Sequence, residues 1–257
     1  MNLFNKKISS NHLITAAIIV VLVLVSAYML GQIPLALLVS IITAVVVDLL
    51  LDKYFKKTCK IPISAVITGL IIGSIAPINA SFVLVILAVL LAELSKFFIR
   101  FKGSNIFNPA AFGLLVSLAV FSVGDSWWAA PSFNFYSLAI PLSFILVIAA
   151  YKAKRIVESL SFIAMVLILS FVSNSFQLSA IASALIGLNY YFAFAMVSDP
   201  KTSPHKFNQQ IAFGAFIALV FFALSVYSVP YALLASLLVG NLSYVAYRVF
   251  NSVKSTA

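Results

Sequence analysis

This chain has few of the residues that soluble or metal-binding proteins need. Its 257 residues include one cysteine, Cys59, together with two histidines and six acidic side chains. A single cysteine excludes a disulfide framework and a cysteine-based zinc or iron–sulfur site. Charged residues make up 9% of the chain, compared with roughly a quarter in soluble domains, so no polar shell can surround a soluble core. The sequence also has no hydrolytic triad, metal-ligand cluster or phosphate-binding loop.

Apolar residues dominate instead. They make up 63% of the chain, and the mean hydropathy is +1.16. Since about 20 mostly apolar residues cross a bilayer, the runs between breakers predict an all-α integral membrane protein with about ten transmembrane helices. The predicted helices are at 13–30, 33–51, 62–76, 81–99, 108–123, 136–151, 156–172, 178–197, 207–228 and 231–250.

The basic residues indicate how these helices are oriented. The net charge of +10 is spread over short clusters rather than one solvated face, so we expect no nucleic-acid partner. Every lysine and arginine lies in, or within a turn of, an end of the chain or an alternate connection, whereas 124–134 has none. The positive-inside rule therefore predicts that both termini are cytoplasmic.

Proline spacing suggests an internal duplication. Pro77 and Pro200 are separated by nearly the same interval as Pro109 and Pro230, and each pair falls at corresponding span ends. Two units of five spans have opposite orientations, which is the inverted-repeat plan of many transporters. The alternative is that prolines collect at span ends because they cannot continue a helix. The predicted repeats are about 1–125 and 126–257.

Short or interrupted spans in corresponding positions of such repeats mark the functional centre, because broken helices direct backbone dipoles into a protein-lined cavity. The third span is the shortest, contains Thr68 and Gly69, and stops at Pro77. Its counterpart, the eighth, is predicted to end at Asp199, just before Thr202. We predict that these ends contribute to a ligand or ion pathway; a simple turn-forming loop is the alternative for the second.

The strongest local motif is GSNIFNPAAFG, from Gly103 to Gly113. Asn105 and Asn108 flank a turn, and Pro109 suits the first position of a helix. The functional interpretation places both asparagines on the pathway. The alternative is that they only cap a helix whose small residues pack closely.

Ionisable residues inside a membrane are costly and usually functional. Glu93 lies within the fourth span, three residues before Lys96, so the two side chains can pair on one helix face. We consider Glu93 a candidate for an ion or proton role. Asp48 and Glu158 lie near span ends, where the alternative is that water solvates them.

Three motifs in matching order resemble the NqrB/RnfD family: SAVITGLIIGSIAP at 64–77, IFNPAAFG at 106–113 and SDPKTSP at 198–204. Lys96 and Asn241 match family positions as well. The family comprises membrane subunits of the sodium-pumping NADH:quinone reductase and of the Rnf ferredoxin:NAD oxidoreductase. The resemblance implies two inverted five-helix repeats, a urea-channel-like fold, a prokaryotic plasma membrane location, and electron transport coupled to ion transport with other membrane subunits.

One departure from the family concerns its flavin. Members in the redox complexes carry flavin on a threonine after the fifth span, whereas this chain has no threonine between Thr68 and Thr202. Covalent FMN is therefore not expected, while non-covalent FMN or riboflavin stays open. The alternative function is a stand-alone transporter or channel for a small solute, such as a flavin. No catalytic or metal-binding residue is assigned. The predicted pathway residues are Thr68, Gly69, Glu93, Asn105, Asn108, Pro109, Asp199, Thr202 and Asn241.

Overall fold

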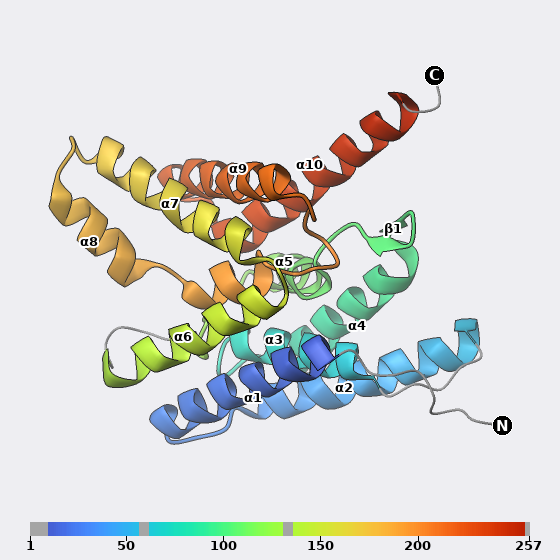
Figure 1. Cartoon of the computed structure of the whole chain (residues 1–257). Helices are drawn as coiled ribbons and strands as arrows, with labels where there is room; N and C mark the ends of the chain where they lie inside the picture. Colours follow the sequence, from blue (N-terminus) through green and yellow to red (C-terminus); the bar gives the residue numbers. More distant parts are fainter. Residues whose placement is uncertain (1–9, 57–61, 131–135, 255–257) are drawn as a thin grey trace. The chain divides into compact units, whose positions relative to one another are not determined.

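The computed structural model describes residues 10–56, 62–130 and 136–254, and these are mostly helical (Figure 1). Cys59 lies outside the described residues. Within these residues the α-helices are accompanied by two short π-helical turns, η1 (Asp52–Lys56) and η3 (Phe192–Met196). The α-helices are α1 (Ser10–Leu30), α2 (Leu35–Leu51), α3 (Ile63–Ile75), α4 (Phe82–Phe98), α5 (Pro109–Phe121), α6 (Tyr136–Lys152), α7 (Ile156–Ser173), α8 (Leu178–Gly187), α9 (Phe207–Val226) and α10 (Ala232–Lys254).

Length and composition make this an all-α membrane protein. Helical segments long and apolar enough to cross a bilayer are Leu35–Phe55, Ile156–Ser173, Phe207–Val226 and Ala232–Ser252, and shorter apolar helices accompany them in the described part of the chain. Both α3 and α5 have 13 residues. At 1.5 Å per residue such a helix reaches only about 20 Å, less than the hydrocarbon core of roughly 30 Å.

The structure corrects the sequence prediction for the eighth span. A continuous helix over 178–197 is wrong, because α8 ends at Gly187 and Leu188 is extended, with ψ of 132°. The chain resumes helical structure after Asn189, whose Oδ1 accepts a hydrogen bond from the backbone N–H of Phe192 at 2.9 Å. An asparagine cap therefore starts a new helical segment that continues into η3.

A small β-hairpin was also not predicted. Strands β1 (Arg100–Phe101) and β2 (Ser104–Asn105) pair antiparallel around a two-residue turn. The turn residues Lys102 and Gly103 have φ of +47° and +82°. Positive φ at both central positions is typical of the tight turn that matches strand twist in hairpins.

The chain forms two compact units. The first comprises Met1–Ile99 and Pro109–Ala130, and the second comprises Arg100–Asn108 and Pro131–Ala257. In the first unit, α2 packs on α3 and α4, and α4 packs on α5. In the second, α7 packs on α8 and α9, and α9 packs on α10. The hairpin, although it lies between α4 and α5 in the sequence, belongs to the second unit.

Glycine allows the closest helix approach in the first unit. A Cβ on Gly113 of α5 would overlap the carbonyl oxygen of Ala88 on α4. Backbone atoms cannot rotate away as a side chain can, so an added methyl must push the two helices apart. Small residues at helix contacts are typical of membrane bundles, where close backbone packing stabilises association.

We therefore expect Gly113→Ala to lower the free energy of unfolding by about 1–3 kcal/mol, the usual cost of overpacking. Gly124→Ala is the matched control, since a Cβ there would meet no atom within 4 Å. Thermal unfolding of the two purified variants in detergent measures the difference. Equal midpoints would show that α4 and α5 do not depend on this contact.

A candidate functional site in the second unit

The loop between η3 and α9 folds back on itself through Asp199. The backbone N–H groups of Thr202 and Ser203 donate to the carbonyl oxygen of Asp199 at 3.2 and 3.1 Å. Its side-chain Oδ1 accepts from the backbone N–H of Lys201 at 3.0 Å. Aspartate commonly fixes turns in this way, by bonding backbone two residues ahead. The turn leaves the second carboxylate oxygen, Oδ2, for contacts with other segments.

Three segments far apart in the sequence meet at this loop. The side-chain amide of Asn108 donates from Nδ2 to Asp199 Oδ2 at 3.2 Å. The backbone N–H of Asn108 donates to Asn241 Oδ1 on α10 at 2.9 Å. Asn241 Nδ2 in turn donates to the carbonyl oxygen of Thr202 at 3.4 Å. Four residues predicted to lie on the pathway are thus brought together.

An acidic side chain enters the same region from α7. Glu158 is fully buried, and its Oε1 accepts a hydrogen bond from Ser203 Oγ at 2.7 Å. Asp199 and Arg155 also interact with it electrostatically. The sequence left solvation at the membrane surface open for Glu158, and its burial excludes that alternative.

Several oxygens here lack a hydrogen-bond partner among the described residues: Glu158 Oε2, Ser159 Oγ and Thr202 Oγ1. Their residues are all at least nine-tenths buried. A buried polar atom without a partner costs free energy, and in native proteins it commonly indicates a ligand, ion or water. One carboxyl oxygen and two hydroxyl oxygens, in α7 and in the loop that Ser203 ties to it, are thus buried without a hydrogen-bond partner in the described part of the chain.

Arg155 holds the other side of the loop. Its guanidinium donates to the carbonyl oxygen of Pro204 and contacts the ring of His205, with Nη2 2.6 Å from Nδ1. Partial desolvation and the positive charges of Arg155 and Arg248 lower the pKa of His205, which favours a neutral ring that can accept this hydrogen bond. Gln210 Nε2 also donates to the Pro204 carbonyl, at 3.3 Å.

Other predicted pathway residues lie elsewhere. Glu93, buried in α4 of the first unit, pairs with Lys96 Nζ at 2.6 Å and interacts with Asp48 on α2. Thr68 donates to the carbonyl oxygen of Ser64 at 2.9 Å within α3. The Thr68 hydroxyl thus has its acceptor inside its own helix. Glu93 has charged neighbours from two helices.

Gly69 has a packing role, because a Cβ there would come within 2.7 Å of the Ile41 Cα on α2. Pro109 is the first residue of α5, the position where its missing N–H does no harm. Asn105 lies in β2 opposite Arg100. Sequence reasoning did not predict roles for Arg155, Ser159 or Gln210; Arg155 was considered only as a marker of the cytoplasmic side.

The segment after α5, residues 125–128, packs against α3 of the first unit. Trp128 Nε1 donates to the carbonyl oxygen of Gly73 at 2.8 Å, and Trp127 Nε1 donates to Asp125 Oδ2 at 2.6 Å. The backbone N–H of Ser126 donates to the Ile75 carbonyl at 2.9 Å. Hydrogen bonds thus fix this segment at the end of α3.

Comparison with known proteins bears on residues 5–157, which match the model of the NQR2, RnfD, RnfE family. The match covers more than half of the chain and includes α1 to α6, the hairpin and Asn108. It ends before the 198–204 motif and Asn241, which the sequence resemblance had included. No curated protein matches the chain. The chain belongs to the NQR2, RnfD, RnfE family.

Proposed function

We propose that this chain is a membrane subunit of an Rnf/NQR-like electron transport complex and that it couples electron transfer to ion movement. Family membership supports the role in such a complex. The observation that carries the ion-coupling part is the buried carboxyl group of Glu158, with a second oxygen that has no partner in the described part of the chain. Ionisable groups at such positions are rare in membrane proteins and are associated with ion or proton pathways.

The surrounding donors suit a small cation or a proton. Glu158, Ser159 and Thr202 present oxygens, and hard monovalent and divalent cations prefer oxygen ligands. The interruption after Gly187 leaves irregular backbone in the eighth segment, which a membrane tolerates where protein or a water-filled cavity surrounds it. Transporters place coupling ions at such broken helices.

We also propose that the two units are inverted repeats, and the pairing of their helices supports this. In the first unit α2 contacts α3 and α4, and α4 contacts α5; in the second, α7 contacts α8 and α9, and α9 contacts α10. These three contacts of the first unit thus each have a counterpart five helices later. In such a repeat, an odd number of spans gives each helix of the second repeat the opposite direction to its counterpart in the first.

Ion uptake by inside-out vesicles from the native host tests the function. Reduced ferredoxin and NADH are supplied as alternative electron donors, and ²²Na⁺ uptake and lumen acidification are both recorded. We expect donor-dependent uptake of one of these ions, and its loss when the gene is deleted. Equal uptake with and without the gene would contradict the proposal.

We expect positions 126 and 201 to lie on opposite sides of the membrane. Ser126→Cys and Lys201→Cys, each in a Cys59→Ser background, place a thiol at an exposed position. The one-sided basic residues predict that a membrane-impermeant maleimide labels position 126 from outside the cell and position 201 only after permeabilisation. Labelling of both from the same side would show that the ten-span topology is wrong.

The second candidate, a stand-alone flavin or small-solute transporter, is favoured by the lack of threonine in 69–201. Without that hydroxyl, the phosphoester link to FMN cannot form at the family position.

We therefore expect no fluorescent flavin band for this chain after denaturing electrophoresis. A fluorescent peptide mapped to 125–131 would contradict that expectation, and riboflavin uptake by liposomes containing only this chain would favour the second candidate.

A further inference from the structure

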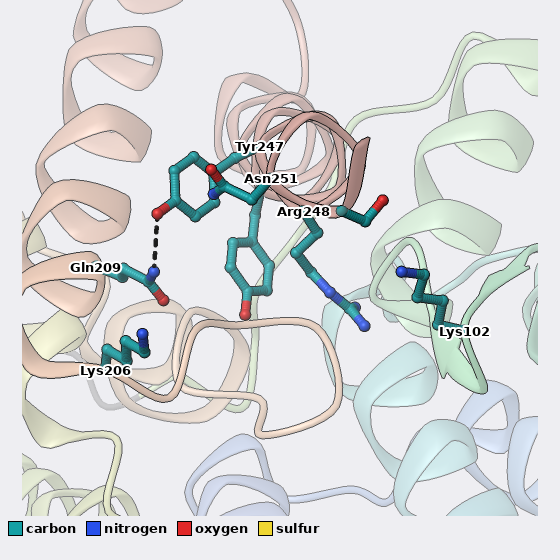
Figure 2. Close-up of a pocket in the computed structure, with 8 residues that line it drawn as sticks. Lys102, Lys206, Gln209, Tyr247, Arg248 and Asn251 are labelled. Atoms are coloured by element: carbon teal, nitrogen blue, oxygen red, sulfur yellow. Dashed lines mark hydrogen bonds between the residues drawn. The ribbon is translucent and has the colours of Figure 1, made fainter. Parts of the chain in front are cut away.

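A basic pocket lies where the hairpin, the start of α9 and the end of α10 meet in the second unit. Its volume is about 570 Å³, within the range of pockets that hold small organic ligands. Figure 2 shows Lys102, Lys206 and Arg248 around the opening, with Gln209, Tyr247 and Asn251 beside them. Neither the proposed ion site nor any predicted pathway residue contributes to this lining.

The hairpin determines where Lys102 lies. Lys102 and Gly103 form the two-residue turn with positive φ, so Lys102 occupies the tip rather than a strand. Arg100 braces the turn by donating to the carbonyl oxygen of Gly103. A tight turn fixed in this way holds the ammonium group of Lys102 near α10, although Lys102 and Arg248 are far apart in the sequence.

Aromatic rings hold Arg248 at the centre of the three cations. Its guanidinium carbon lies 5.4 Å from the ring centroid of Phe101 and 5.8 Å from that of Tyr244. Lys102 Nζ lies 5.7 Å from the same Phe101 ring. Such cation–π contacts fix the orientation of a guanidinium while leaving its N–H donors available to a ligand.

The electrostatics of the pocket favour an anion. Three cationic side chains and no carboxylate are among its lining residues. The first turn of α9, which contains Gln209, adds the partial positive charge of a helix N-terminus. Gln209 Nε2 donates to the Tyr247 hydroxyl at 3.1 Å and so ties α9 to α10. Like charges gathered around one opening repel one another, and a bound anion removes that repulsion.

We infer that this pocket binds a phosphate-bearing anion. A phosphate presents several oxygens in different directions, which matches one arginine fork and two lysine ammonium groups from separate segments better than a single carboxylate does. The pocket lies at the ends of two helices long enough to cross a bilayer, so it is at the level of lipid headgroups. Basic pockets between helices at this level hold anionic headgroups. Two sources of this chemistry fit: an anionic phospholipid and a soluble phosphate ester.

Thermal unfolding of the purified full chain in detergent distinguishes these sources. The probes are phosphatidylglycerol in mixed micelles, phosphatidylcholine as its net-neutral counterpart, and soluble glycerol 3-phosphate. We expect phosphatidylglycerol, but not phosphatidylcholine, to raise the unfolding midpoint by several degrees, and high salt to reduce the effect. A midpoint that rises with glycerol 3-phosphate but not with phosphatidylglycerol would support the proposal and assign the site to free phosphate esters.

The variants connect the response to the pocket. Arg248→Gln should weaken the apparent affinity at least ten-fold. Because Arg248 packs on two rings, its substitution also changes the packing of α10. Lys206→Gln, at an exposed position, is therefore measured as well and should weaken the affinity several-fold. Lys152→Gln is the matched control, an exposed cation at the end of α6 that does not line the pocket. The inference is overturned if neither phosphatidylglycerol nor glycerol 3-phosphate raises the unfolding midpoint of the wild type more than phosphatidylcholine does. It is also overturned if Lys206→Gln and Lys152→Gln have the same effect on the apparent affinity.

Discussion

Asn108→Leu is expected to reduce electron-transfer-driven ion uptake by about 10- to 100-fold, since hydrogen bonds to charged groups contribute roughly 1.5–3 kcal/mol. Leucine keeps similar bulk but removes the Nδ2 donor that holds Asp199 Oδ2. The backbone N–H of residue 108 can still donate to Asn241, so the chain should fold. Uptake per unit of purified chain in inside-out vesicles measures the effect.

The matched control is Asn208→Leu, the same substitution at an exposed position in the first turn of α9. It should retain wild-type uptake. If Asn108→Leu also retains it, the asparagine is only a helix cap, and the ion site lies away from the 198–204 motif.

Glu158→Gln is expected to abolish coupled ion uptake while the amount of folded chain in the membrane stays the same. Glutamine keeps an oxygen that can accept the Ser203 hydroxyl bond, so the loop retains its anchor. It removes the negative charge that a bound cation or a transferred proton needs. Glutamine has the size and shape of glutamate, so the packing of the buried site is kept although Arg155 loses a nearby negative charge. Ion uptake and the thermal unfolding midpoint are measured on the same preparation.

Asp125→Asn makes the same chemical change in the first unit, where the carboxylate accepts a bond from Trp127. We expect this variant to keep coupled uptake. Glu158→Gln vesicles that take up as many ions per electron as the wild type would show that the buried carboxyl is structural.

Hydropathy alone located the helices well, because apolar runs between breakers are long and regular. It failed in the eighth span, where the break depends on two residues, Gly187 and Asn189, inside an otherwise apolar run. A glycine closely followed by an asparagine is a recognised stop and start signal for helices. The hairpin was missed because strands of two residues have no alternating pattern to detect.

The candidate site shows a different limit. Asn108 was named from a helix-start motif, Asp199 from a span end and Asn241 from the family resemblance. No periodicity or spacing could show that Asn108 contacts the other two. Arg155 escaped attention because its charge was already explained by membrane topology, although it also anchors the Pro204 carbonyl. Glu93 was the preferred acidic residue, yet Glu158 is the carboxyl group that binds Ser203 in the loop that Asn108 contacts.

Purification from native membranes tests the central claim most directly. The affinity-tagged full chain is extracted in a mild detergent, and the preparation is examined for bound subunits and for electron transfer from NADH or reduced ferredoxin. Our account predicts that other subunits of an electron transport complex copurify with the chain and that the preparation transfers electrons. A chain that purifies alone, shows no electron transfer and moves riboflavin across liposomes by itself would contradict it.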